Sequence, residues 1–216
     1  MKNKDAIVIA GSKGIGKSIA ESLEDICNVS ITNKNILNTS NLDSVRKFIS
    51  INKETDVLVL NTGGPPKMNF FDITEDDWFK YHNQLFLGFS MILQKMKIKK
   101  NGFVFLISSM HIKEPNVDML LSTTYRTAFL SVFKALSKNT GIQNISYINI
   151  APGPIKTDRL KSLVPDLEKL EKSLPMKRIG DPKEIGDFIK MIIDNNIKYL
   201  NGATINFDGG ISNFLF

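Results

Sequence analysis

The sequence predicts a single α/β domain in which helices cover both faces of a doubly wound parallel sheet. Apolar runs of strand length alternate with segments of helical periodicity, and this alternation favours right-handed crossovers between parallel strands. The 216 residues suit one domain spanning 1–216, because neither an internal repeat nor a linker divides them. The expected strands lie at 6–10, 29–32, 56–60, 103–107, 145–150 and 203–207.

The composition is globular and narrows the possible partners. Hydrophobic residues make up 42% and charged residues 23% of the chain. The net charge of +6 is scattered, which favours a solvated surface or an anionic cofactor over nucleic acid. Cys27 is the only cysteine, so we expect no disulfide and no metal site. No run approaches the ~18 apolar residues of a membrane span, and the N-terminus has the pattern of a strand. We therefore expect a cytoplasmic protein without a membrane partner.

The first strand, 6–10, leads into a glycine-containing turn and then a helix. Glycines let the backbone approach a phosphate, and the free N–H groups of a helix N-terminus favour negative charge. This context predicts a dinucleotide-binding loop, with a tight structural turn as the alternative. The loop consists of Gly11, Ser12, Lys13, Gly14, Ile15 and Gly16.

The second strand, 29–32, ends at Asn33 and Lys34. An acidic side chain at this point would accept hydrogen bonds from a ribose 2′-hydroxyl, and the sequence has none there. Lys13 and Lys34 are available instead for a 2′-phosphate. We therefore predict NADP as the cofactor, with NAD possible; the alternative is that both lysines are simply solvated.

Polar and glycine residues also follow the next two strands. A short helix is expected at 42–49, and strand 56–60 ends in Asn61-Thr62-Gly63-Gly64-Pro65-Pro66, where the glycines permit a backbone turn beside a ligand. The segment 72–99 predicts a helix that ends in the basic cluster 95–100 and whose apolar face forms core or a subunit contact. Strand 103–107 runs into Ser108-Ser109, a loop, and a helix beginning near Leu120. Strand ends of this kind line the ligand crevice of an open parallel sheet.

The last third of the chain supplies a predicted cover for that crevice. Strand 145–150 is followed by the motif Pro152-Gly153-Pro154-Ile155-Lys156-Thr157. The charged, leucine-containing segment 158–178 suits a mobile cover. One more amphipathic helix is expected at 185–192, before strand 203–207 and the turn Asp208-Gly209-Gly210.

Taken together, these motifs resemble the short-chain dehydrogenase/reductase family over nearly the whole chain. The resemblance implies a Rossmann-type fold, a nicotinamide cofactor, hydride transfer between a small-molecule carbonyl and an alcohol, and a homodimer or homotetramer. It also implies that Thr157 contacts the cofactor carboxamide. The cofactor-binding residues that follow from the loops and the resemblance are Gly11, Ser12, Lys13, Gly14, Ile15, Gly16, Asn33, Lys34, Asn61, Gly63, Pro152, Gly153, Ile155 and Thr157.

The chain departs from the family at the catalytic residues, which are normally Asn, Ser, Tyr and Lys. Tyr125 is followed four positions later by Phe129, which can neither bind ribose nor shift a pKa. Counted from Ser109 at the family's usual spacing, the Tyr position falls on Ser122, and the Lys position on Arg126, one helical turn further. This resembles a divergent branch with Asn-Thr-Gly-Gly-Pro-Pro and Ser-x-x-x-Arg.

Two further departures concern the Asn position and the glycine turn. The Asn position falls on Leu85, so that only the family's Ser is retained, as Ser109. Two residues, not the usual three, separate Gly11 from Gly14, so the phosphate cradle is expected to have one backbone N–H fewer.

The catalytic candidates are therefore Ser109, Ser122, Arg126 and Tyr125. A serine hydroxyl is a poor proton donor compared with tyrosine, and arginine stays protonated. Tyr125, His111 and Lys113 remain alternative donors. Two functions stay open: an NAD(P)-dependent oxidoreductase with an atypical proton relay, or a catalytically inactive nucleotide-binding or sensor protein on the same fold.

Overall fold

A computed structural model describes residues 4–139 and 141–215. Six parallel strands form one sheet in the order β2-β1-β3-β4-β5-β6. From β1 the chain first adds β2 on one side and then adds β3 to β6 on the other side, so the strand order reverses between β1 and β3. The predicted doubly wound α/β fold is confirmed. The strands are β1 (Lys4–Val8), β2 (Cys27–Ile31), β3 (Glu54–Leu60), β4 (Lys97–Ile107), β5 (Ser146–Pro152) and β6 (Thr204–Phe207).

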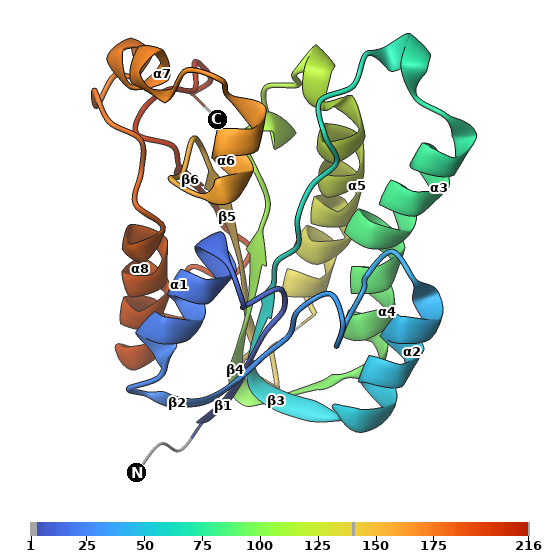
Figure 1. The fold of residues 1–216 in the computed structure, drawn as a ribbon. Coiled ribbons are helices and arrows are strands. Elements are labelled where there is room, and N and C mark those ends of the chain that lie inside the picture. Colours follow the sequence, from blue (N-terminus) through green and yellow to red (C-terminus); the bar gives the residue numbers. More distant parts are fainter. Residues whose placement is uncertain (1–3, 140, 216) are drawn as a thin grey trace.

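Helices cover the two faces of the sheet, with α1 and α8 on one face and α2, α4 and α5 on the other (Figure 1). Two short helices, α6 and α7, lie over the end of the sheet opposite the N-terminus. The helices are α1 (Gly14–Leu23), α2 (Leu42–Ile51), α3 (Glu75–His82), α4 (Gly88–Lys95), α5 (Leu120–Ser137), α6 (Asp158–Leu163), α7 (Leu167–Ser173) and α8 (Pro182–Asp194). None of the helices in the described part of the chain is both long and apolar enough to cross a membrane.

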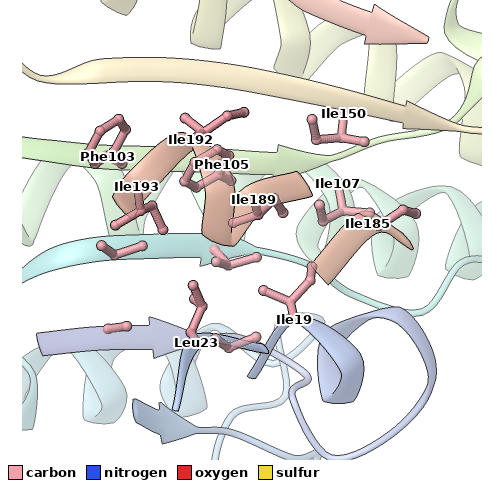
Figure 2. Close-up of a cluster of buried hydrophobic side chains, with 14 of the residues drawn as sticks. Ile19, Leu23, Phe103, Phe105, Ile107, Ile150, Ile185, Ile189, Ile192 and Ile193 are labelled. Atoms are coloured by element: carbon pink, nitrogen blue, oxygen red, sulfur yellow. The ribbon is translucent and has the colours of Figure 1, made fainter. Parts of the chain in front are cut away.

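The core consists of two apolar layers that share the strands between them. Phe103, Phe105 and Ile107 of β4 belong to the layer under α1 and α8, whereas Val104 and Leu106 belong to the other layer. Figure 2 shows the first layer, in which isoleucines of α8 face the side chains of β4 and β5. Strands buried on both faces in this way hold their carboxyl ends at fixed positions, and the candidate site is built on those ends.

The apolar faces that were expected to form either core or a subunit contact lie in the core. Phe89 and Ile92 of α4 and Phe129 and Phe133 of α5 are 1% exposed or less, and all four pack in the second layer. Their apolar residues recur at helical spacing and so form one face of each helix, and this face is buried because both helices lie flat on the sheet.

The expected helical end at 95–100 is wrong. The helix stops at Lys95, and β4 begins at Lys97, where it pairs with the start of β3. The ammonium group of Lys99 lies 2.9 Å from a carboxylate oxygen of Asp5 and 3.1 Å from one of Asp56. Lys99 therefore has its charged partners on other strands, which local helical periodicity could not reveal.

Candidate functional site

The turn between β1 and α1 has the backbone geometry of an anion-binding loop. Ala10 and Gly14 adopt left-handed conformations, with φ of 51° and 53°. The helix begins at Gly14, and within the described residues no side chain caps it and no acidic residue occupies its first turn. The first N–H groups of such a helix are free to bind an anion, and the helix dipole favours negative charge at this end.

Neighbouring strands close tightly around this turn. A Cβ on Gly16 would lie 2.3 Å from the carbonyl oxygen of Ala10 and 2.6 Å from Asn61 Nδ2. Asn61 donates a hydrogen bond of 3.4 Å to that carbonyl, which ties the end of β3 to the turn. A Cβ on Gly14 would lie 3.2 Å from Thr157 Cγ2, so the loop after β5 borders the turn on another side.

The end of β2 also lies against the turn, because the Gly11 N–H donates to the Thr32 carbonyl at 2.9 Å. The side-chain oxygen of Asn33 accepts the backbone N–H groups of residues 35 and 36, at 2.9 and 3.1 Å. Lys13 and Lys34 are both exposed, and neither forms an ion pair with any residue that the structure describes. Two free cations thus flank the place where the adenosine ribose was expected.

Ser122 and Arg126 lie one helical turn apart on α5 and contact each other. Arg126 Nε donates to Ser122 Oγ at 3.1 Å, Nη1 donates to the Ile107 carbonyl at 2.9 Å, and Nη2 donates to the Thr62 carbonyl at 3.2 Å. The Arg126 side chain therefore joins the carboxyl ends of β3 and β4, with 9% of the residue exposed. Burial, and secondarily the positive charge of Arg159, lowers the pKa of Arg126 to about 10, so it is cationic at neutral pH.

Tyr125 projects toward different neighbours from those of Arg126. Its ring packs edge-on against Trp78 and His82 of α3, with centroids 5.9 and 5.6 Å away. The Tyr125 hydroxyl makes no hydrogen bond to any described residue, and burial raises its pKa. The structure thus brings Ser122 and Arg126 together at the strand ends and places the Tyr125 ring against α3.

The two serines after β4 differ in their hydrogen bonds. Ser108 is buried and donates its hydroxyl to the Ile150 carbonyl at 3.1 Å. Ser109 caps the 3₁₀ turn η3 (Met110–Ile112) by accepting the backbone N–H of His111 at 3.3 Å. Its hydroxyl proton has no acceptor among the residues described, so Ser109 can donate a hydrogen bond to a ligand.

His111 and Lys113, the other two candidate proton donors, contact groups outside the Ser122–Arg126 pair. His111 Nδ1 lies 3.3 Å from the carbonyl oxygen of Glu114, within the same loop. The ammonium group of Lys113 sits 4.5 Å from the ring centroid of Phe214, in the C-terminal tail. The backbone N–H of Asn213 donates to a Glu114 carboxylate oxygen at 2.6 Å, so the tail is fastened to the loop that carries both residues.

Leu85, at the expected Asn position, is a core residue. It lies in a π-helical turn, η2 (Asn83–Leu87), is 1% exposed, and packs with Tyr81 and Leu121. The polar group at this position is the preceding Gln84, whose Nε2 donates to the Gly63 carbonyl at 2.6 Å. Sequence reasoning missed Gln84, although its position next to Leu85 was a usable signal.

The motif after β5 combines packing with the wall of a cavity. A Cβ on Gly153 would lie 2.8 Å from Asp208 Cα, so glycine is needed where β5 and β6 end side by side. Pro152 is the last residue of β5. Ile155 lines a cavity of about 320 Å³ together with Leu174 and Met176, from the segment expected to be a cover.

Arg159, on α6, is a second residue that sequence reasoning missed. The Nη2 atoms of Arg159 and Arg126 lie 3.7 and 3.8 Å from the position that a Cβ would occupy on Gly64, and Ser122 Oγ lies 3.6 Å from it. Arg159 is partly buried and donates to the Pro65 carbonyl. Its only sequence signal was its place within 158–178, because its approach to Gly64 depends on how α6 folds back over the strand ends.

Comparison with known proteins gives a consistent result. A family model described as enoyl-(acyl carrier protein) reductase matches residues 17–212. The 3-oxoacyl-[acyl-carrier-protein] reductase of Chlamydia trachomatis is 28% identical over 242 residues, covering 97% of this chain and 98% of the relative.

Two solved structures share the fold. A blue fluorescent protein from a metagenomic library, in complex with NADPH, has a TM-score of 0.88 and 21% identity, covering 98% of this chain and 99% of the other. A short-chain dehydrogenase from Burkholderia cenocepacia, in complex with NADP, has a TM-score of 0.87 and 20% identity, covering 96% and 97%. The fold, the motifs and the match over most of its length show that this chain belongs to the short-chain dehydrogenase/reductase family.

Proposed function

We propose that the protein is an NADP(H)-dependent oxidoreductase that transfers hydride between a small carbonyl or alcohol substrate and the nicotinamide. The observation that carries this proposal is the juxtaposition of an uncapped glycine turn at α1 with a buried Ser122–Arg126 pair at the ends of β3 and β4. Two solved proteins of the same fold are in complex with NADP or NADPH, which supports a nicotinamide nucleotide as the cofactor.

The chain's own residues fit the cofactor. The free N–H groups of the first turn of α1 suit the pyrophosphate, and glycine at positions 14 and 16 lets Thr157 and Asn61 close around the turn. Lys13 and Lys34 suit a 2′-phosphate, and the absence of an acidic residue at 33–34 favours NADP over NAD. Remaining N–H groups of Arg126 suit the hydroxyls of the nicotinamide ribose. When bound, the nicotinamide supplies or accepts the hydride.

The proton relay that we propose uses Ser109, Ser122 and Arg126. Ser109 donates a hydrogen bond to the substrate oxygen and polarises the carbonyl. Ser122 gives its proton to that oxygen during reduction and takes it back during oxidation. The Nε–H of Arg126 already points at Ser122 Oγ, so the buried cation stabilises the serine alkoxide that proton loss creates. This contact offsets the high intrinsic pKa of the serine hydroxyl.

The proposal is tested by NADPH oxidation with a panel of aldehydes and ketones. Wild-type protein is expected to turn over at least one carbonyl compound, and Arg126→Ala is expected to lose at least about 100-fold in kcat/KM, as for removal of a transition-state hydrogen-bond donor. Thermal unfolding identifies an Arg126→Ala protein that has merely failed to fold, in which case Ser122→Ala replaces it. Turnover no higher than that of the folded variants would contradict the proposal.

A second function, a nucleotide-binding or sensor protein without catalysis, is favoured by one observation. Leu85 occupies the expected Asn position and is buried, while three of the five N–H groups of Arg126 donate to the protein itself. Calorimetry separates the two functions: micromolar NADPH binding without turnover of any carbonyl compound supports the sensor, and no binding at millimolar NADPH excludes both.

A further inference from the structure

Two arginines converge on one small space at the strand ends without an acidic partner. The Nη2 atoms of Arg126 and Arg159, together with Ser122 Oγ, surround the point where Gly64 lacks a side chain. No ion pair within residues 4–139 and 141–215 involves either arginine. Buried arginines in proteins are normally paired with an anion, so the guanidinium charges of Arg126 and Arg159 lack, among the described residues, the partner that such residues usually have.

The charges around the pair do not supply that anion. Asp158, beside Arg159 in the sequence, is 88% exposed and pairs with Lys161 at 3.4 Å. Burial lowers the pKa of Arg159, and its positive charge contributes to lowering the pKa of Arg126. Two cations held close together, one buried and one partly buried, repel each other, so an anion between them would be bound favourably.

Hydrogen-bond donors remain available on both side chains. Arg126 donates three of its five N–H groups within the protein, and Arg159 donates one, to the Pro65 carbonyl. The planar fork of a guanidinium group matches the two oxygens of a carboxylate, and such charge-assisted pairs are roughly twice as strong as neutral hydrogen bonds. The missing side chain at Gly64 leaves the space that such a group would enter.

The cofactor phosphates have other sites. The pyrophosphate suits the first turn of α1, and the 2′-phosphate suits Lys13 and Lys34, whereas Arg159 lies on α6, within the segment predicted to cover the crevice. We infer that the substrate carries a carboxylate beside its reacting carbonyl or alcohol, and that Arg159, next to Arg126, binds this carboxylate and selects keto acids over neutral ketones. This inference rests on the proposed function and specifies its substrate class.

Steady-state kinetics with NADPH test the inference directly. The substrates are α-, β- and γ-keto acids of equal chain length, each compared with its methyl ester. For at least one acid, wild-type kcat/KM is expected to exceed that of the ester by ~10–100-fold, the range for a hydrogen bond to a charged group. Arg159→Gln is expected to remove this preference by lowering activity on the acid alone. Esters as good as their acids, or an equal loss on both, would overturn the inference.

Arg46→Gln is the matched control, because it removes the same charge from an exposed side chain that pairs with Asp43 on α2. It is expected to keep the preference for acids. Gly64→Ala serves if Arg159→Gln fails to fold, since its methyl group would make ordinary contacts of 3.6–3.8 Å. By occupying the shared space, it is expected to lower activity on the acid more than on the ester; an unchanged acid-to-ester ratio would contradict the inference.

A binding measurement decides the inference even if no carbonyl compound is reduced, in which case the proposed oxidoreductase function alone fails. Thermal unfolding is followed without cofactor in the presence of benzoate, benzamide or inorganic phosphate. Benzoate is expected to raise the unfolding temperature of the wild type but not of Arg159→Gln, and benzamide is expected to have no effect. Equal shifts with benzoate and benzamide, or with benzoate and phosphate, would overturn the assignment of a carboxylate.

Discussion

At the scale of single residues, the position of a side chain on α5 decides its chemistry. Ser122 and Arg126 are four residues apart and therefore share a face, which contacts the ends of β3 and β4. Tyr125 lies about 100° away around the helix and packs against Trp78 and His82. Tyr125 is adjacent to Arg126 in sequence but has quite different neighbours, so closeness in sequence does not give the two side chains the same surroundings.

This arrangement predicts opposite results for two conservative substitutions. Tyr125→Phe keeps the ring packing and removes a hydroxyl that has no hydrogen-bond partner in the described structure, so kcat should change by less than about twofold. Ser122→Ala removes the proposed proton donor and should lower kcat by about 100-fold or more. Steady-state NADPH oxidation measures both. A large loss in Tyr125→Phe with a small loss in Ser122→Ala would contradict the proposed relay.

The sequence identified some residues of the candidate site and missed others. Ser122 and Arg126 could be selected from the sequence because helical spacing and the distance from Ser109 are both local properties. Arg159 could not, since its contact with the space beside Gly64 is made across α6, and no local pattern distinguishes it from other charged residues of 158–178. Gln84 was missed although it adjoins Leu85, because the π-helical turn at Asn83–Leu87 changes which side chains face the strand ends.

At the scale of elements, the helix ends show how differently α1 and α8 are built. α8 begins with a capping box in which the side chains of Asp181 and Glu184 accept backbone N–H groups, and Pro182 occupies its first turn. α1 has no such cap within the described residues. A capped N-terminus contributes stability, whereas an uncapped one leaves its N–H groups free, as the proposed cofactor site at α1 requires.

The cap of α8 gives a prediction about stability and pH. The Arg178 guanidinium, and then the Asp181 backbone N–H, lower the pKa of Glu184 from its usual 4.5 to about 2. A carboxylate with a lowered pKa stabilises the folded state fully above its unfolded pKa, and this contribution disappears as pH falls toward the folded pKa. Glu184→Gln should therefore lower the free energy of unfolding by about 0.5–1 kcal/mol at pH 7, because the neutral amide can still accept the capping N–H but loses the charge-assisted pair with Arg178, which is exposed to water.

Urea unfolding at several pH values measures this effect. The difference between wild type and Glu184→Gln should be constant above pH 4.5 and should shrink between pH 4.5 and 2. Lys17→Gln is a suitable control, because it removes a solvent-exposed i,i+4 ion pair with Glu21. It should lower the free energy of unfolding by less than about 0.5 kcal/mol. A difference that grew on acidification would contradict the assigned direction of the pKa shift.

At the scale of the whole molecule, the sheet order explains why distant segments meet. The chain moves from β1 to β2 in one direction and from β3 to β6 in the other, so the turns after β1 and β3 border the point of reversal. Ligands of open parallel sheets bind at this point. The segment 158–178 and the C-terminal tail then reach the same end of the sheet from the far edge, where the tail contacts the loop after β4.

The fold was predictable because its signals repeat along the chain: apolar strands, amphipathic helices and polar strand ends. Local reasoning failed where partners come from elsewhere, as for Lys99 of β4, which pairs with Asp5 and Asp56. The apolar tail carried no periodic pattern, so its attachment to Glu114 could not be predicted. Oligomeric state stays a prediction, and the exposed rings of Phe71 and Phe79, 90% and 60% exposed, are surfaces that a homodimer or homotetramer could bury.

The central claim is that Ser122 and Arg126, and not Tyr125, face the reacting groups. A crystal structure of the protein with NADP bound tests it most directly. We expect a guanidinium N–H of Arg126 within hydrogen-bond distance of a hydroxyl of the nicotinamide ribose, Ser109 and Ser122 on the same side of the nicotinamide, and the Tyr125 ring still against α3. A Tyr125 hydroxyl beside Ser109, with Ser122 turned away from the cofactor, would contradict the claim.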